Sequence, residues 1–166
     1  MVEDPVDLVS LLVDVAGLSQ TELEQLAQGL FRQLYVGIGR CGDHCTTHDG
    51  HPVVFWADRA DHAFRISDDW ARYPHRKNVV DPQRVARIRW IGEIIAGRVQ
   101  GTGCWEIPKP GSTTGPKRLY AVFPAQYVVW LEPRKQGGWK FSSAYPASRD
   151  YIRRKAKTGR KIWERK

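Results

Sequence analysis

Short apolar runs and apolar–polar alternation in the C-terminal half of the chain predict β-strands. Strands are expected at 119–123, 127–131 and 139–144, because each is rich in β-branched and aromatic residues and is bounded by proline or glycine. The connections between them are too short for a crossover helix, so we expect an antiparallel meander. A fourth strand is predicted at 103–107, and a fifth could lie at 53–56.

The N-terminal half instead shows apolar residues with a helical period. One such segment spans 7–16, and a second spans 19–34, where Ser19 and Glu22 form a capping-box pattern. We interpret residues 1–36 as an acidic helical hairpin that could dimerise or dock on another protein.

A third helix is predicted over 81–98, with Asp81 as its N-cap and Pro82 in its first turn. The pattern therefore predicts an α+β protein with N-terminal helices packed on a four- to five-stranded antiparallel sheet, followed by a basic C-terminal helix or tail. The expected organisation is an acidic helical hairpin at 1–36, a Cys/His-containing loop at 37–50, a core at 51–148 and the basic helix or tail at 149–166.

Charge is distributed unevenly along the chain. Residues 1–31 carry six acids and no Lys or Arg, whereas residues 32–166 carry all 26 bases and the other 12 acids, which gives −6 and +14. Within 149–166 there are nine bases and two acids, interleaved with Tyr151, Ile152 and Trp163. Aromatic side chains within a basic run are typical of single-stranded nucleic-acid binding, although a solubilising tail has the same composition.

Five side chains that can bind zinc lie close together in the 37–51 region. Their spacing, C-x3-C-x2-H-x2-H, lacks the long spacer of zinc fingers, so a metal site and a polar loop of independent residues both remain open. The five are Cys41, His44, Cys45, His48 and His51.

No segment approaches 18 apolar residues, and the acidic N-terminus does not resemble a signal peptide. Three cysteines, an odd number, argue against a disulfide framework. We therefore expect a cytoplasmic protein without a membrane partner.

Several segments together resemble the barnase/EndoU/colicin/RelE-like ribonuclease superfamily, and within it the phage-associated nuclease families. The resemblance covers about residues 50–150, and its strongest feature is a last strand that ends in a hydroxyl residue followed by Ala-Tyr. The similar segments are DHAF at 61–64, the helix at 81–97, RLYAVF at 118–123, YVVWLE at 127–132 and WKFSSAYP at 139–146.

The resemblance implies a metal-independent endoribonuclease, with no cofactor, that drives the ribose 2′-OH onto the adjacent phosphate. Such chemistry needs a base, an acid and cations that stabilise the phosphorane. His62 is the first candidate for base or acid, with His75 and His51 in reserve. The expected catalytic residues are His62, Lys117, Arg118, Tyr120, Ser143 and Tyr145, and the expected nucleic-acid-binding residues are Arg84, Arg87, His75, Arg76, Arg153, Arg154 and Lys155.

The expected substrate is RNA, either tRNA or mRNA, in the setting of a toxin, a phage effector or a defence nuclease. An antitoxin or immunity protein would then be a natural partner, and the N-terminal helices could mediate a dimer. Two alternatives stay open: a non-catalytic nucleic-acid-binding or regulatory protein, and a zinc-dependent protein built on the Cys41–His51 loop.

Overall fold

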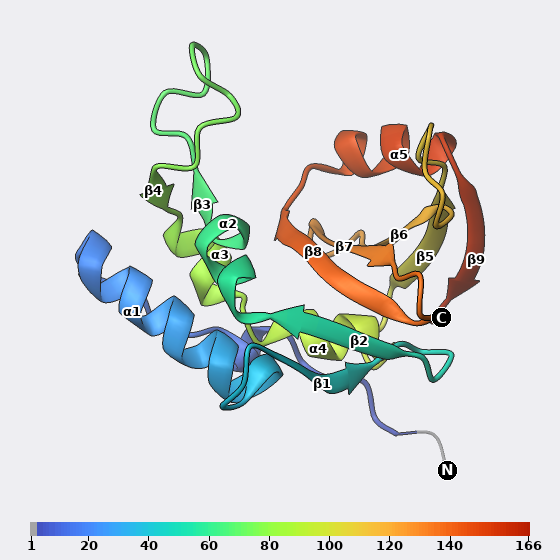
Figure 1. Cartoon of the computed structure of the whole chain (residues 1–166), viewed down its shortest axis with the longest axis horizontal. Coiled ribbons are helices and arrows are strands. Elements are labelled where there is room, and N and C mark those ends of the chain that lie inside the picture. The colour runs from blue at the N-terminus through green and yellow to red at the C-terminus, as the bar shows by residue number, and fades with distance from the viewer. Residues whose placement is uncertain (1–2) are drawn as a thin grey trace.

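A seven-stranded mixed sheet is the centre of the computed structural model, which describes residues 3–166 (Figure 1). Its strands are β1 Cys41–Thr46, β2 Pro52–Trp56, β5 Thr102–Ile107, β6 Lys117–Val122, β7 Tyr127–Pro133, β8 Trp139–Pro146 and β9 Arg160–Glu164. They lie in the order β1-β2-β8-β7-β6-β5-β9. Every neighbouring pair is antiparallel except β2 and β8, which are parallel.

The α+β class is confirmed, but the expected four- to five-stranded antiparallel sheet is wrong in detail. The predicted meander is present as β5 to β8, and the predicted strand at 53–56 is β2. Two strands of this sheet were not expected: β1 forms within the predicted Cys/His loop, and β9 forms within the predicted helix or tail. Both are edge strands with few buried side chains, so their pairing with a neighbour, rather than apolar periodicity, determines their conformation.

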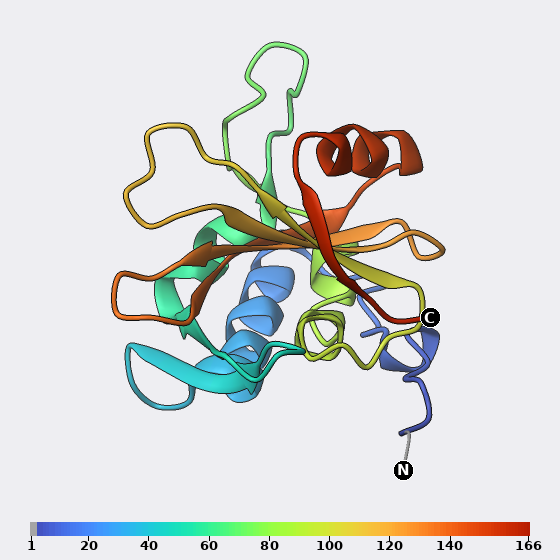
Figure 2. The same cartoon turned by 90° about the vertical axis from the view of Figure 1, so that its right-hand side faces the viewer.

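Helices cover both faces of the sheet (Figures 1 and 2). One face packs against α1 Gln20–Phe31, α3 Pro82–Ala86 and α4 Trp90–Ile95, and the opposite face of β5 to β7 packs against α5 Arg149–Lys157. The short helix α2 Ala60–Ala63 follows β2 and contacts both α1 and β8. No helix among residues 3–166 is long and apolar enough to cross a membrane.

The predicted N-terminal helical hairpin has one α-helix rather than two. Before α1 the structure contains a single 3₁₀ turn, Val9–Leu11, within an otherwise extended segment. Apart from local turns, this segment is held by hydrogen bonds to other parts of the chain. Val13 N donates to Ala86 O at 2.9 Å, and Trp90 Nε1 donates to Leu8 O at 2.9 Å. Leu8 and Leu11 therefore pack against the core without forming an α-helix, whereas Leu12 is exposed.

The predicted helix at 81–98 is divided in two. Asp81 does cap α3 by accepting a hydrogen bond from Gln83 N, and Pro82 is its first residue. Arg87 then leaves the helical conformation, with φ −102° and ψ 12°, and tighter i to i+3 bonds connect α3 to α4. The apolar face stays continuous across this break, because Val85, Ile88 and Ile91 are all fully buried.

The basic C-terminal segment folds back onto the sheet through α5 and β9. Ser148 caps α5 by accepting a hydrogen bond from Tyr151 N, and Ile152 is the fully buried anchor of the helix. Gly159 makes the turn into β9, where a Cβ atom would lie 2.2 Å from Glu106 O. A glycine is therefore needed for β9 to reach β5.

A hairpin projects from the sheet at residues 67–78, which we call the arm. Its base is a two-stranded ladder of β3 Arg65–Ile66 and β4 Val79–Val80. Figure 2 shows the arm, α5 and the loop 108–116 rising on the same side of the main sheet. The three segments together border the open side of that face.

The side chain of Phe31 joins α1 to the sheet. It is fully buried, and its ring lies 5.8 to 5.9 Å from the rings of Tyr35, Phe55, Phe64 and Phe141. Aromatic contacts of this kind come from four separate elements, so Phe31 is the centre of the core on this face.

Phe31→Ala should lower the free energy of unfolding by about 3–5 kcal/mol, because it leaves a cavity at the centre of this cluster. Phe123→Ala is the matched control, since Phe123 is half-buried on the other face and contacts Trp105. It should cost roughly 1–2 kcal/mol. Urea unfolding of both variants measures the difference, and equal losses would contradict this account of the core.

Candidate functional site

A cleft of about 500 Å³ lies between α5 and the sheet, and we call it the α5 cleft. One wall comes from β6, β7 and β8, a second from α5, and a third from the loop after β5. Its lining residues are Ile107, Pro108, Lys109, Pro110, Lys117, Trp130, Ser142, Ser143, Tyr145, Tyr151, Lys155 and Thr158.

Strand alternation brings four of these residues to the same face. Lys117 begins β6, Trp130 lies in β7 opposite Ser143 of β8, and Tyr145 follows two residues later. Side chains two residues apart on a strand share a face, and partners across a ladder do as well. Residues that are far apart in the sequence therefore converge on the cleft.

A bulge in β8 adds a second hydroxyl group. Trp130 pairs with Ser143, whereas the next residue of β7, Leu131, pairs with Phe141, so Ser142 is an extra residue in the ladder. Both serines consequently line the cleft instead of lying on opposite faces. Bulges often redirect side chains at functional sites.

Three aromatic side chains connect α5 to the sheet through hydrogen bonds. Trp130 Nε1 donates to the hydroxyl oxygen of Tyr145 at 2.9 Å, and the hydroxyl groups of Tyr145 and Tyr151 lie 2.6 Å apart. Burial, together with the Tyr151 hydroxyl, raises the pKa of Tyr145 well above its usual range. Tyr145 therefore stays neutral and keeps its proton at physiological pH.

The lining of the cleft is cationic. It contains Lys109, Lys117 and Lys155, and no carboxylate or imidazole group among residues 3–166 contributes to it. Glu132, which is not part of the lining, pairs with two of them: its Oε1 lies 3.3 Å from Lys109 Nζ and 3.5 Å from Lys117 Nζ. Lys155 Nζ lies over the Tyr151 ring at 5.6 Å. Burial alone would raise the pKa of Glu132, but Lys109 and Lys140 lower it below its usual value.

Three more basic residues border the cleft near the base of the arm, and we call them the cationic rim. Arg84 lies over the Tyr145 ring at 5.0 Å, and Arg59 Nε donates to Ser142 O at 2.6 Å. The third is Lys77, whose pKa is lowered by the protein around its ammonium group and by the cations of Arg84 and Arg59. An anion bound at the rim would relieve the repulsion between the Lys77 ammonium group and these two guanidinium groups.

The structure places two expected catalytic residues, Arg118 and Tyr120, on the opposite face of the sheet. Arg118 is 5% exposed, and each of its two terminal nitrogens donates a hydrogen bond to one carboxylate oxygen of Asp49 at 2.9 Å. Its guanidinium lies over the Trp139 ring, 4.4 Å from the ring centre. Tyr120 is fully buried, and its hydroxyl group lies 2.7 Å from His48 Nδ1. These contacts hold the β1–β2 turn against the sheet.

His62 also lies outside the α5 cleft. It is exposed on α2, and its side chain enters no hydrogen bond or ion pair found among residues 3–166. Nothing in this arrangement brings its imidazole to the serines or the lysines of the cleft.

The expected nucleic-acid-binding residues are distributed over three elements. Lys155 and Arg84 belong to the cleft and its rim, whereas Arg87 bonds to Gln83 and lies over the Trp90 ring at 5.1 Å. His75 and Arg76 are exposed on the arm, and Arg153 and Arg154 are exposed on α5.

The Cys41–His51 region does not form a metal-binding cluster: residues 3–166 contain no group of three or more His, Cys, Asp or Glu side chains that could hold a metal ion. The reason is that the region is a strand and a turn, not a loop that closes on itself. Cys41 is exposed, Cys45 is buried near Gly92 O, and His48 stacks on Trp163 at 4.3 Å.

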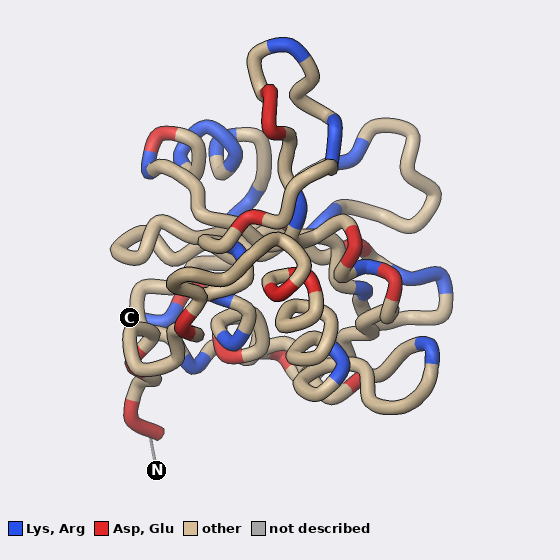
Figure 3. The backbone as a smooth tube through the Cα atoms, turned by 90° about the vertical axis from the view of Figure 1, so that its left-hand side faces the viewer, with Lys and Arg blue, Asp and Glu red and all other residues tan. Residues whose placement is uncertain are grey.

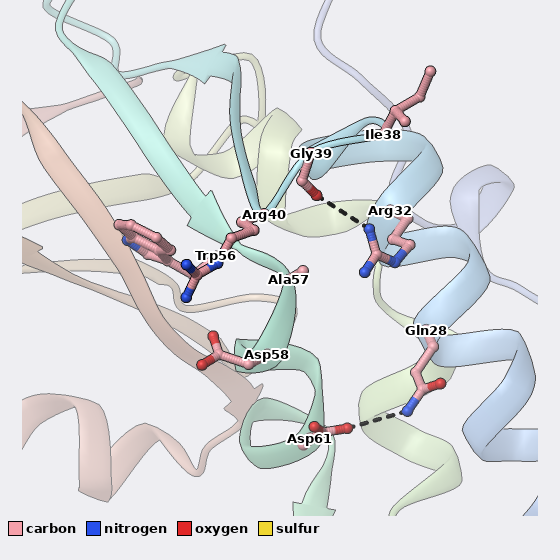
Figure 4. Close-up of a pocket in the computed structure, with 9 residues that line it drawn as sticks. All are labelled: Gln28, Arg32, Ile38, Gly39, Arg40, Trp56, Ala57, Asp58 and Asp61. Carbon is pink, nitrogen blue, oxygen red and sulfur yellow. Dashed lines mark hydrogen bonds between the residues drawn. The ribbon is translucent and has the colours of Figure 1, made fainter.

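A second pocket, of about 520 Å³, lies at the other side of the molecule between α1 and the end of β2 (Figure 4). Figure 4 shows Arg32 bonded to Gly39 and Gln28 bonded to Asp61 along its walls. Its lining has two arginines and two aspartates, so its charge is mixed. It favours a polyanion less than the α5 cleft does.

Comparison of the chain with protein-family profiles, with curated proteins and with solved structures found no match. The geometry of the chain itself therefore carries the functional argument.

The sequence indicated Lys117, Ser143, Tyr145 and Lys155 but missed several residues around them. Tyr151 was visible as an aromatic residue within a basic run, whereas Trp130 looked like an ordinary core residue. Arg59 gave no signal, because its role depends on the bulge at Ser142.

Asp49→Asn should lower the free energy of unfolding by about 2 kcal/mol at pH 7, because it leaves the buried Arg118 guanidinium without its ion-pair partner. Burial would raise the pKa of Asp49, but hydrogen bonds from Arg118 and Thr47 outweigh it and hold the pKa well below its usual range. A depressed carboxyl pKa stabilises the fold above the unfolded pKa, near 4, and this stabilisation is lost as the pH falls further.

The difference between wild type and Asp49→Asn should therefore be constant from about pH 7 to about pH 4 and shrink below that. Thermal melting across this pH range measures it. Asp43→Asn, in the same edge strand at an exposed position, is the control and should have little effect. A difference that grows on acidification would contradict the account.

Proposed function

We propose that this protein binds RNA through the α5 cleft and cleaves it there as a metal-independent endoribonuclease. The observation that carries the proposal is the convergence of Lys117, Ser143, Tyr145 and Lys155, which were indicated by sequence, on one cationic cleft. Lysine ammonium groups and neutral hydroxyl groups are suitable partners for the oxygens of a phosphodiester. The resemblance to the barnase/EndoU/colicin/RelE-like superfamily supports the same reading.

Cations and hydroxyl groups would stabilise the transition state. The phosphorane formed by attack of the 2′-OH carries more negative charge on its non-bridging oxygens than the phosphodiester does. Lys117 and Lys155 would neutralise that charge, and Ser143 would donate a hydrogen bond to one of these oxygens. The three groups come from β6, α5 and β8, so the fold itself sets their spacing.

The tyrosine pair would supply a proton to the leaving 5′ oxygen. Tyr145 accepts a hydrogen bond from Trp130 and can donate its own proton to the Tyr151 oxygen. In that arrangement the Tyr151 proton is free for a ligand in the cleft. Because the pKa of Tyr145 is raised, Tyr145 keeps its proton and its hydrogen bond to Tyr151 before the reaction.

A base must also accept the 2′ proton. No imidazole or carboxylate group among residues 3–166 lines the cleft, so this step falls to solvent hydroxide or to a group outside the lining. His62 is exposed on α2 outside the cleft, and it is our candidate for such a group if the bound RNA extends from the cleft to α2.

The absence of an imidazole from the cleft lining also favours a second candidate function. The same cations and aromatic rings would serve a protein that binds RNA without cleaving it. Salt-dependent RNA binding with no cleavage product would establish this second function in place of the first.

Lys117→Met and Lys155→Met should each lower the rate of RNA cleavage in EDTA by about 10²-fold, because each removes a cation from the developing phosphorane. Each should also reduce the dependence of log Kd on log salt by about one unit, as expected when one phosphate contact is lost. Product formation from total RNA on a denaturing gel and fluorescence anisotropy measure the two quantities.

Lys135→Met is the matched control: it makes the same change at an exposed position in the β7–β8 turn, outside the cleft lining. It should retain cleavage at the wild-type rate. Cleavage that persists in both cleft variants and in Ser143→Ala would refute the assignment of the α5 cleft. His62→Ala separates the two choices for the base, since it lowers the rate only if His62 takes the 2′ proton.

A further inference from the structure

The arm carries two of the three large aromatic side chains that are exposed among residues 3–166. Trp70 is 68% exposed and Tyr73 is 48% exposed, and the third is Trp56 at 40%, near the mixed-charge pocket. An indole ring held in water without a partner is costly, and aromatic side chains gathered at one exposed site commonly mark a binding surface.

Hydrogen bonds within the arm hold this surface in one shape. Asp69 N bonds to Ser67 Oγ at 3.1 Å, Tyr73 N bonds to Asp69 O at 2.8 Å, and Asp68 N bonds to Asn78 Oδ1 at 3.1 Å. Ser67 is buried at the base of the arm. The two aromatic rings are therefore presented by an ordered hairpin.

Two arginines of the arm lie against the Tyr73 ring. The Arg76 guanidinium lies 4.9 Å from the centre of the Tyr73 ring and pairs with Asp68, and the Arg72 guanidinium lies 6.0 Å from the same ring. His75 is exposed beside them. In contrast, Trp70 is 68% exposed and makes no aromatic or cation–π contact among the described residues, so its ring is accessible to a ligand.

The cationic rim lies between the arm and the α5 cleft. Lys77 is at the end of the arm, Arg84 lies over Tyr145, and Arg59 bonds to the backbone of Ser142. Figure 2 shows α5 and the arm on the same side of the sheet, and Figure 3 marks basic positions on both. A nucleic-acid backbone that runs from the cleft to the arm would therefore pass the cationic rim and then the basic residues of the arm.

We propose that the arm is a base-stacking site, in which Trp70 and Tyr73 stack on unpaired bases of an RNA whose backbone lies in the α5 cleft. The substrate class is then single-stranded RNA, because the bases of a duplex are already stacked on one another and cannot reach these rings. This inference rests on the proposed function, since it assumes that RNA is the ligand of the cleft.

The charge beside the rings favours RNA over a protein partner. An interface with another protein is usually depleted of charge at its centre, whereas here three basic side chains, His75 and two aspartates lie beside the exposed aromatic residues, and Arg76 pairs with Asp68. The basic side chains exceed the aspartates by one. Aromatic rings interleaved with cations are typical of sites for single-stranded nucleic acid.

The test uses the full-length protein, EDTA and a fluorescent 2′-O-methyl oligonucleotide of about ten nucleotides, which cannot undergo 2′-OH attack. Its affinity is compared with that of the same sequence in a duplex, and with that of a strand in which the unpaired bases are replaced by abasic sites. The wild-type protein should bind the single strand more tightly than either. The double variant with Trp70→Ala and Tyr73→Ala should raise the Kd for the single strand by about 10–100-fold and leave the salt dependence of that Kd unchanged.

Abasic substitution should weaken binding to the wild-type protein but have little further effect on the double variant, because both changes remove the same contact. Trp70→Phe should keep most of the affinity, and Trp56→Ala is the control for loss of an exposed tryptophan elsewhere.

The outcomes separate this inference from the proposed function. A wild-type protein that binds none of the three probes overturns the proposed function itself. A wild-type protein that binds RNA, together with a double variant that binds the single strand equally well, overturns the stacking site and leaves the arm to a protein partner. Equal weakening of single-strand and duplex binding also overturns it, because stacking on unpaired bases predicts loss of the single strand alone.

Discussion

The contact of α5 with the sheet determines the candidate site. Ile152 is the fully buried anchor, and the hydrogen bonds from Trp130 to Tyr145 and between Tyr145 and Tyr151 fix the helix on the side next to the cleft. Without this contact, Lys155 and Tyr151 would not face Lys117 and the two serines. The same contact orients the tyrosine hydroxyl groups that the proposed chemistry uses, so folding and function depend on one small cluster.

Strand β6 shows how one constraint assigns adjacent residues to different roles. Lys117 faces the α5 cleft, whereas Arg118, the next residue, faces the other side and is buried against Asp49 and Trp139. Both are cations next to a predicted sheet, and composition alone cannot distinguish them. The alternation of side chains along a strand makes one a ligand-facing residue and the other a structural residue.

The elements that could be predicted from the sequence are those that local interactions determine. The meander β5 to β8 was predictable because apolar runs and turn residues record it directly. Strands β1 and β9 were not, because their conformation depends on pairing with distant partners. The N-terminal segment shows the converse. Its leucines have a helical period, but its backbone forms one 3₁₀ turn and otherwise bonds to distant residues such as Ala86 and Arg98.

The site was predictable to a similar degree. Residues carried by the resemblance included Lys117, Ser143 and Tyr145, which the structure brings together, and also His62 and Tyr120, which it places elsewhere. Proximity of this kind depends on strand register and on the bulge at Ser142. Neither is encoded in a pattern that can be read from the sequence alone, and the contribution of Arg59 depends on both.

The most direct test of the central claim is a titration of isotopically labelled protein with single-stranded 2′-O-methyl RNA, followed residue by residue through backbone amide chemical shifts. The account predicts shifts concentrated at 107–117, 142–145 and 151–158, with a second group on the arm at 67–78. Shifts concentrated at the mixed-charge pocket around Arg32, Arg40 and Trp56 would contradict it, because that result would place the RNA on the other side of the molecule.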